Sequence, residues 1–510
     1  METKRTKKAI LDWDWKTEVI AAGLLMAFAF FINRGIQIKG LFMDDLYMWS
    51  CYGEQTFREF VFPVGGTRCR FLYYLVAYAQ MAAIGGKLGW FVPCNIIVNG
   101  LIAYTVYRFG MRLSRSRILG FFCGFFYLLS RMAYYQIAQA CGLMETLALW
   151  LAIGVLYGVY RYFEGTKKAE RFFWLANALY FGVCFVHERY MVLVVLLLAA
   201  LALKKEKKIL RWILPIVLCV LVQLIRLAFI GTISPAGTGG TNVEDTLNLR
   251  QAVKFALSQV FFLFGINAGP SYLTALSWGE TADWVKKLVF GADAVLLILI
   301  GDFVGLLIRD RIRRVERLKT SALFVIFIGA CIVCSSVTIR VEVRWIYVSM
   351  TAAWLFLAYM CGQLTDWNRR RNILCIALVL CYGILMYPVE NYYRQHFDNI
   401  YFWHSQQEYN SLAEETYEKY GKNIFGKKIY ILENTYGVTR FYADTFFKTF
   451  DPERKAEGTE VIFADSLDEI GTITEDMVVL REDVGAYRYQ DITDLLREFQ
   501  EKKILRRQVH

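Results

Sequence analysis

The stretch LRWILPIVLCVLVQLIRLAFI, residues 210–230, decides the class of fold. It is almost wholly apolar, and its length lies within the roughly 17 to 25 residues that a helix needs to cross the ~30 Å hydrocarbon layer of a membrane. The string KKEKK, Lys204 to Lys208, stands directly before it. A long apolar run beside a cluster of lysines is typical of a transmembrane helix with a cytoplasmic flank.

Similar apolar runs recur along the first three quarters of the chain. The sequence is 56% hydrophobic and 16% aromatic, with a mean hydropathy of +0.34, which excludes an ordinary soluble globular protein. Apolar length and the positive-inside rule together predict about eleven transmembrane helices. We place them near residues 17–34, 88–109, 118–134, 142–160, 171–186, 190–203, 210–230, 287–308, 320–338, 345–362 and 373–388. The expected fold is an all-α polytopic membrane protein.

The net charge of +12 has a role in topology and does not indicate a nucleic-acid partner. The cations stand between apolar runs, in the strings 112–117, 161–171, 204–208, 309–319 and 367–371. With a cytoplasmic N-terminus and the predicted spans, all of these strings fall on the inner side, where juxtamembrane cations belong. We therefore expect a multi-pass protein of the plasma membrane.

Two long external segments follow from this topology, residues 35–87 and 231–286. The first contains the apolar stretch 71–84, and the sequence leaves open whether this stretch spans the membrane or lies on it. Counting it as a span would move most basic strings to the outer side, so we expect an interfacial helix. The glycine-rich start of the second segment is expected to form a flexible loop.

The composition changes after Pro388. Residues 389–510 are charged, and they alternate strand-like stretches (KKIYILEN, EVIFADS, DMVVLRED) with helix-like ones (VTRFYADTFFKTF, ITDLLREFQEK). We expect a membrane domain over residues 1–388 and a small extracytoplasmic α/β domain over residues 389–510.

Asp44 and Asp45 form an acidic pair in the first external loop, soon after the first span. They stand among aromatic residues where the membrane surface is expected. Neighbouring side chains point in different directions, so one carboxylate can face a cavity while the other faces solvent or the backbone. A desolvated carboxylate has a raised pKa and can act as a general base. A solvated turn or a helix cap is the alternative.

An acidic pair soon after the first helix of a many-span protein resembles the GT-C superfamily of glycosyltransferases, which use polyprenyl-phosphate sugars. The resemblance covers the layout of residues 1 to 388 and implies a GT-C-like fold. It also implies that the first-loop aspartate is the catalytic base, with Asp44 slightly preferred over Asp45. The chain shows no nucleotide-binding loop, which agrees with a lipid-phosphate donor.

Further polar residues fall on the expected external side. Gln139 and Glu145 lie in or beside the second external loop, and Glu145 resembles the second acidic site of the superfamily. The metal-binding acidic pattern of that superfamily is not clearly reproduced. The residues thus indicate no certain cofactor, and a divalent ion, Mg²⁺ or Mn²⁺, is left open.

Two basic clusters are candidates for contacts to the donor. His187, Glu188 and Arg189 stand between two apolar runs, where charges are costly unless they are paired or functional. They favour a phosphate or sugar contact, with a structural ion pair as the alternative. Arg340 and Arg344 lie four residues apart, share a face, and could clamp a phosphate. Arg344 resembles the late arginine of the superfamily that holds the carrier phosphate; anchoring at the membrane interface is the alternative.

Together these features predict an inverting membrane glycosyltransferase that moves a sugar from a polyprenyl-phosphate carrier to an extracytoplasmic glycan or protein acceptor. The alternatives are a lipid-linked glycan flippase or transporter, whose intramembrane charges would line a path, and a catalytically inactive surface-assembly protein. Nothing in the sequence indicates which sugar, which acceptor or which oligomeric state applies.

Overall fold

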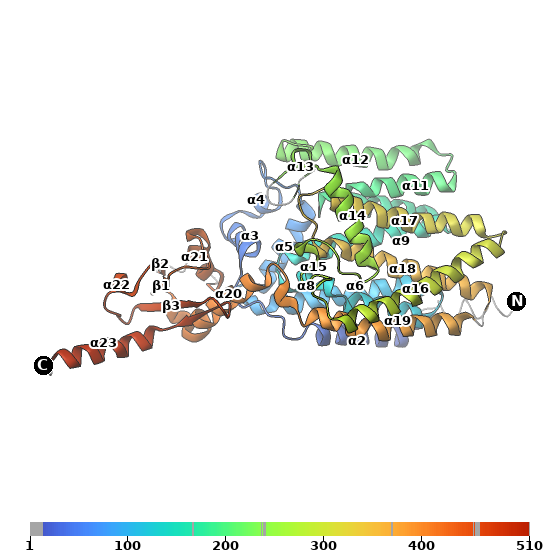
Figure 1. Cartoon of the computed structure of the whole chain (residues 1–510). Helices are drawn as coiled ribbons and strands as arrows, with labels where there is room; N and C mark the ends of the chain where they lie inside the picture. Colours follow the sequence, from blue (N-terminus) through green and yellow to red (C-terminus); the bar gives the residue numbers. More distant parts are fainter. Residues whose placement is uncertain are drawn as a thin grey trace.

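A computed structural model describes residues 14–165, 168–235, 237, 241–368, 371–451, 453 and 459–508. The basic N-terminal stretch expected in the cytoplasm lies outside these residues, as do parts of the glycine-rich segment that follows Ile230. The described chain is mostly helical, and a small sheet extends from one end of a helical bundle (Figure 1). The predicted combination of an apolar helical bundle with a small C-terminal sheet is confirmed.

Eight helices of the described chain are long and apolar enough to cross a membrane. They are α2 (Trp15–Ile32), η1 with α6 (Leu88–Trp90 and Phe91–Ser114), α9 (Gly142–Phe163), α12 (Ile209–Ile230), α16 (Asp283–Arg309), α17 (Arg314–Ser336), α18 (Val343–Trp367) and α19 (Arg371–Arg394). A further crossing is formed if α7 (Arg117–Leu129) and the segment Arg131–Ala138, which is bent from it by 52°, count as one span. That segment holds η2 (Arg131–Ala133) and α8 (Tyr134–Ala138).

Two of the predicted spans are occupied by shorter helices. Residues 171–186 correspond to α10 (Ala169–Cys184), and residues 190–203 to η3 (Glu188–Leu193) followed by α11 (Val194–Lys204). Each helix is shorter than the roughly 20 residues of an ordinary transmembrane helix. The count of about eleven crossings stays a prediction.

Short helices gather at the end of the bundle that carries the sheet (Figure 1). They are α3 (Met43–Glu54), α4 (Phe57–Val61), α5 (Phe71–Ile84), α13 (Val243–Thr246), α14 (Leu249–Leu263) and α15 (Ser271–Thr274). At 1.5 Å per residue, α5 is about 21 Å long, too short to cross a ~30 Å layer. Its first turn docks on the end of α10, where the N–H groups of Leu72 and Tyr73 donate to the carbonyl of Phe185.

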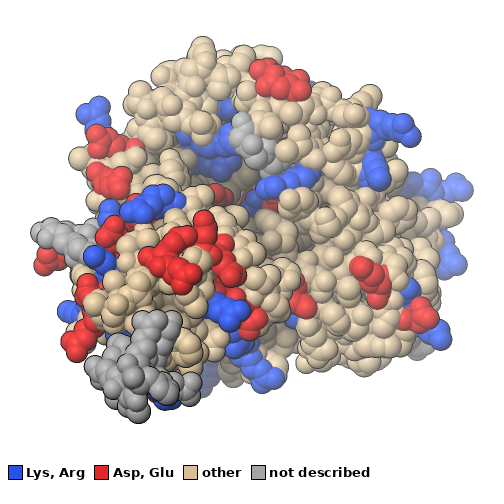
Figure 2. Space-filling model, turned by 60° about the vertical axis from the view of Figure 1, so that its left-hand side comes forward, with Lys and Arg blue, Asp and Glu red and all other residues tan. Residues whose placement is uncertain are grey.

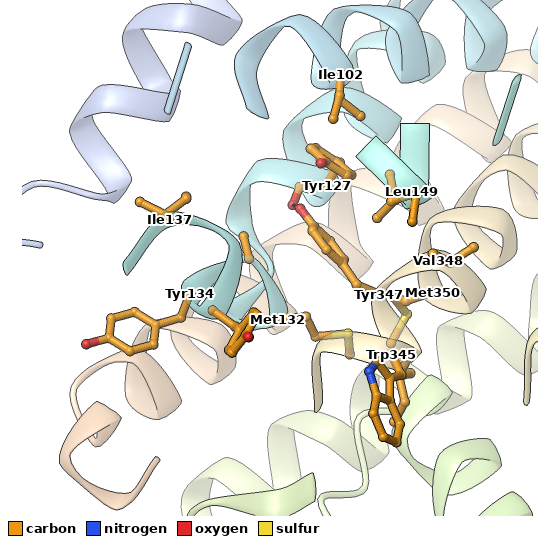
Figure 3. Close-up of a cluster of buried hydrophobic side chains, with 14 of the residues drawn as sticks. Ile102, Tyr127, Met132, Tyr134, Ile137, Leu149, Trp345, Tyr347, Val348 and Met350 are labelled. Atoms are coloured by element: carbon orange, nitrogen blue, oxygen red, sulfur yellow. Dashed lines mark hydrogen bonds between the residues drawn. The ribbon is translucent and has the colours of Figure 1, made fainter. Parts of the chain in front are cut away.

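The bundle has a buried centre and an apolar outside. In α18, 83% of the apolar window is buried, against 17% in α12, so α18 is central and α12 peripheral. The ring of Tyr347 on α18 stacks on that of Tyr127 on α7, with 4.7 Å between the ring centres. Figure 3 shows the two side chains next to each other. On α12, Val217 and Leu224 are exposed. An apolar outer face of this length fits contact with lipid.

Close helix packing at the centre depends on Gly362 of α18. A methyl group there would overlap the carbonyl oxygen of Leu113 on α6. We expect Gly362→Ala to lower the free energy of unfolding by about 1–3 kcal/mol, because backbone atoms would have to move apart. Gly301→Ala on α16 is the control, since nothing lies within 4 Å of a Cβ there. Thermal unfolding of the purified protein in detergent tests this; equal effects of the two changes would contradict it.

The basic strings 204–208 and 309–319 lie at the α11–α12 and α16–α17 connections, at the end of the bundle opposite the sheet (Figure 1). The sheet therefore stands on the side away from these cations. This arrangement agrees with the predicted distribution of charge, in which the external segments and the C-terminal domain share one side.

The C-terminal sheet has the strand order β2-β1-β3-β4. Its strands are β1 (Lys428–Leu432), β2 (Glu460–Ala464), β3 (Met477–Asp483) and β4 (Arg488–Asp491). Strand β1 pairs in parallel with β2 and β3, whereas β4 pairs antiparallel with β3. The three strands expected from alternating sequence patterns are confirmed, and β4 is an additional strand.

The remaining helices connect this sheet to the bundle. They are η4 (Phe397–Asn399), α20 (Trp403–Ala413), the π-helical turn η5 (Glu414–Glu418), η6 (Gly421–Ile424), α21 (Arg440–Phe446), η7 (Phe447–Thr449), α22 (Leu467–Ile470) and α23 (Thr493–Gln508). Helix α19 continues through Pro388 to Arg394, beyond the expected domain boundary. Helix α20 is hydrogen-bonded to the segment between α2 and α3. The Asn410 side chain accepts from the N–H of Lys39 and donates to the carbonyl of Gln37.

Candidate functional site

A cavity of about 810 Å³ opens at the end of the bundle that carries the sheet. We call it the reaction cavity. Its walls come from α3 to α5, the start of α9, η3, the end of α17 and the start of α18. Six of the candidate residues predicted from the sequence line this cavity: Asp44, His187, Glu188, Arg189, Arg340 and Arg344. Figure 2 views the sheet side of the molecule and shows basic side chains around a hollow.

The acidic pair is divided between two environments. Both residues lie in the first turn of α3, where consecutive side chains point about 100° apart. Asp44 is exposed and lines the reaction cavity, whereas Asp45 is 1% exposed. The carboxylate of Asp45 accepts from the backbone N–H groups of Ala140, at 2.8 Å, and Cys141, at 2.7 Å. Asp45 thus holds α3 against the start of α9, and Asp44 is the carboxylate that a substrate could reach.

Burial raises the pKa of Asp45 from its ordinary value of 3.8 to about 6, against the opposing effect of the bonds from Cys141 and Ala140. The folded state then binds this proton more tightly than the unfolded state does. The contribution of Asp45 to stability is therefore largest below about pH 4 and falls by about 3 kcal/mol as the pH rises to about 6.

We expect Asp45→Asn to remove this part of the pH dependence, because the asparagine side chain does not titrate. The measurement is thermal unfolding of the purified protein between pH 4 and pH 7. Asp283→Asn, at a side chain that is 90% exposed, is the matched control. The prediction is wrong if Asp45→Asn follows the same pH profile as the unchanged protein.

Arg340 and Arg344 share one buried counter-ion. Glu342 is fully buried; Arg344 lies 2.6 Å from its carboxylate and Arg340 lies 2.8 Å from it. The hydroxyl of Tyr401 donates to the same carboxylate at 3.1 Å. The two guanidinium groups are thereby held at the cavity wall with part of their charge neutralised.

Glu188 and Arg189 are both paired. The guanidinium of Arg70 donates two hydrogen bonds to the carboxylate of Glu188, each 2.9 Å long, and Arg189 forms an ion pair with Glu145. The positive charge of Arg70 thus compensates the buried carboxylate of Glu188. Both residues therefore form ion pairs, and both line the reaction cavity. A contact to phosphate or sugar stays a prediction.

His187 lies between two carboxylates, with its ring nitrogens 3.8 Å from Glu145 and 3.7 Å from Glu188. Burial and then the positive charge of Arg189 lower its pKa well below the ordinary value. The imidazole is therefore neutral near pH 7. It can donate a hydrogen bond to a phosphate or a hydroxyl, but it adds no charge to the cavity.

Glu145 and Gln139 do not line the reaction cavity. Glu145 is buried behind it, where it pairs with Arg189 and accepts from Nε1 of Trp345 at 3.2 Å. Gln139 is buried, and its backbone carbonyl accepts from Asn95. Glu145 thus holds Arg189 in place at the cavity wall, and the hydrogen bond from Asn95 to Gln139 fixes the segment before α9.

Arg68 and Arg70 also line the cavity, although sequence reasoning did not select them. The guanidinium of Arg68 donates to the backbone carbonyls of Thr67 and Gly237, and no described carboxylate lies within ion-pair distance of it. Both residues belong to a segment that is expected to be external, where arginine runs against the usual distribution of charge. That signal could have identified them.

The cavity residues do not fit a divalent cation. Both oxygens of Asp45 accept backbone N–H groups, and Glu188 is occupied by Arg70. Asp44 remains as the accessible carboxylate, and five arginines surround the cavity, whereas Mg²⁺ and Mn²⁺ prefer several oxygen ligands. In the described part of the chain, no group of three or more His, Cys, Asp or Glu side chains is placed to hold a metal ion.

No protein-family model matches the sequence, and no curated protein matches it. The chemistry of the reaction cavity is therefore the basis for a functional interpretation. One exposed carboxylate stands there among several arginines and a neutral histidine. Such a set can accept a proton at one point and stabilise an anion at another.

Proposed function

We propose that this chain is a membrane glycosyltransferase of the GT-C type, which moves a sugar from a polyprenyl-phosphate carrier to an extracytoplasmic glycan or protein acceptor. One observation carries the proposal: Asp44 and Arg344 line the same cavity, together with four further arginines. A general base and an anion-binding wall are the two elements that displacement of a sugar from phosphate requires.

The charge of the cavity suits a phosphate ester. The arginines at the wall are Arg68, Arg70, Arg189, Arg340 and Arg344, and the carboxylates that face or pair with them are Asp44, Glu145, Glu188 and Glu342. Among the described residues, positive groups thus slightly outnumber negative ones. A singly charged phosphodiester would be attracted, and the added negative charge of the departing phosphate would be stabilised further.

The mechanism is a single displacement with inversion. The carboxylate of Asp44 takes the proton from an acceptor hydroxyl, whose oxygen forms a bond to the anomeric carbon of the sugar. The bond from that carbon to the phosphate oxygen breaks, and the phosphate leaves with the electron pair. Arg344 and Arg340 stabilise the anion, and His187 can donate a hydrogen bond to it. No separate general acid is needed, because phosphate leaves as an anion.

The proposed topology has about eleven crossings, with α10 and the η3–α11 pair as short spans. A cytoplasmic location of the strings 204–208 and 309–319 would put the reaction cavity and the sheet outside a plasma membrane. The charged residues that line the cavity come from α3, η3 and the segments beside α5 and α18, which meet at one end of the bundle. A transporter would be expected to carry such residues through the middle of its spans.

The test is incubation of the purified protein with a panel of radiolabelled polyprenyl-phosphate sugars. We expect one donor to be consumed and its sugar to be released or transferred. Consumption of no donor across the panel would contradict the proposal. Transbilayer movement of an intact lipid-linked sugar in vesicles, without cleavage, would support transport instead.

A further inference from the structure

A second cavity of about 750 Å³ lies beside the reaction cavity. The short helix α8 separates the two, because Tyr135 lines the reaction cavity and Tyr134 lines the second one. The other walls are the end of α2, the end of α19 and the first turns of α20. We call it the amide cavity, after the carboxamide residues that line it: Gln37, Asn391, Gln395, Gln406, Gln407 and Asn410.

Gln406 leaves a buried hydrogen-bond acceptor without a partner. The residue is 1% exposed, and its Nε2 donates to the carbonyl of Gly40 at 3.1 Å and to Oδ1 of Asn410 at 2.9 Å. These two bonds fix the orientation of the amide. Its Oε1 then has no partner among the described residues. A buried acceptor of this kind is costly, and because Gln406 lines the amide cavity, a small movement of its side chain toward a ligand donor would relieve that cost.

Other carboxamide side chains of the amide cavity are also without hydrogen-bond partners among the described residues. Within the described part of the chain, no side-chain hydrogen bond engages Asn391, Gln395 or Gln407, all of which line the cavity. Aromatic rings stand among them: Trp403 lines the cavity, and Tyr134 stacks on Phe397 at 4.0 Å. Amides match the donor and acceptor character of sugar hydroxyls, and flat apolar rings pack against the C–H faces of a sugar.

The charges of the amide cavity favour a neutral ligand over a lipid phosphate. Its lining holds two arginines and two acidic residues, namely Arg34, Arg394, Asp398 and Glu414. The guanidinium of Arg394 donates to the carbonyls of Leu128, Leu129 and Ser130, at the end of α7, so it is occupied. Arg34 lies over the ring of Phe31, with its guanidinium carbon 4.6 Å from the ring centre. Among the described lining residues, no cluster of unpaired cations is therefore present to bind an anion.

We propose that the amide cavity binds neutral sugar residues of a glycan. The site is distinct from the reaction cavity and does not depend on the proposed sugar transfer. Its amides hold the hydroxyl groups, and its rings cover the apolar face of the sugar. A glycan bound there would stand across α8 from the reaction cavity.

The test is binding of the full chain, purified in detergent, to an array of neutral oligosaccharides, followed by titration of the strongest ligand. We expect binding to the unchanged protein, and an increase in Kd of about 3- to 10-fold for each of Asn391→Ala and Gln395→Ala, which remove side chains without described partners. Gln490→Ala, at an exposed position of β4, should bind as the unchanged protein does. Because the readout is binding and not turnover, the result does not depend on whether the chain transfers a sugar.

Binding of no neutral oligosaccharide would overturn the proposal. So would equal affinity of the unchanged protein and both variants, because the glycan would then occupy another surface. Vesicles of phosphatidylglycerol provide the third arm. Displacement of the bound oligosaccharide by these vesicles, with vesicle binding weakened by Asn391→Ala, would assign the cavity to a lipid headgroup instead.

Discussion

Replacement of Asp44 by asparagine is expected to lower the rate of sugar transfer by about 10²- to 10⁴-fold, the usual contribution of a positioned general base. The amide cannot accept the proton of the acceptor hydroxyl, but it keeps the size of the side chain. Since Asp44 is exposed, the fold should be unaffected. Donor affinity should change little, because the proposed donor contacts come from the arginines.

The measurement is the initial rate of transfer at saturating donor, together with a thermal unfolding curve of the variant. Asp283→Asn is the control for a generic loss of surface charge, because that side chain is 90% exposed and does not line the reaction cavity. If Asp44→Asn keeps a rate within about threefold of the unchanged protein, a smaller effect than general-base catalysis supplies, another group is the base.

Glu342→Ala is expected to lower the free energy of unfolding by about 3–5 kcal/mol, the usual result of removing one partner from a buried ion pair. Glu342 is fully buried and lies against Arg340 and Arg344. Its loss would leave two guanidinium groups without their nearest counter-ion and the hydroxyl of Tyr401 without its acceptor. Glu244→Ala, at an exposed position of α13, should cost less than about 0.5 kcal/mol.

A double variant separates the lost charge from the lost volume. Adding Arg344→Ala to Glu342→Ala removes one of the stranded charges, so the double variant should be less destabilised than the sum of the two single changes. Unfolding in detergent, followed by tryptophan fluorescence, gives all three values. Additive losses would show that the pair has no net coupling and that the cost of Glu342→Ala is one of packing alone.

The sequence predicted the bundle and most of the sheet from local patterns. Apolar length is a property of each segment by itself, so α12 and α16 are visible without knowledge of their neighbours. Strands β1 to β3 are visible for the same reason, through their alternating side chains. Strand β4 has only four residues and depends on pairing with β3, so no local pattern indicates it.

The candidate site could be predicted as a set of residue types, but not as a set of contacts. Arg340 and Arg344 were predicted as a pair because they lie four residues apart and share a face, where two guanidinium groups could clamp a phosphate. Their counter-ion Glu342 was visible between them, but nothing in the sequence says that it is buried. Arg70 could not be paired with Glu188, because the two residues are 118 positions apart.

The sequence alone determined that this chain folds as an apolar helical bundle with a charged C-terminal α/β region. Both features depend on the composition of each segment and on the periodicity of its apolar residues. Only the tertiary structure decided which aspartate faces the cavity. Asp45 turns inward because it meets backbone N–H groups 95 and 96 positions away, at the start of α9. Asp44, the next side chain round the same helix, is left at the cavity. Such a choice arises from docking of distant segments, and no local pattern encodes it.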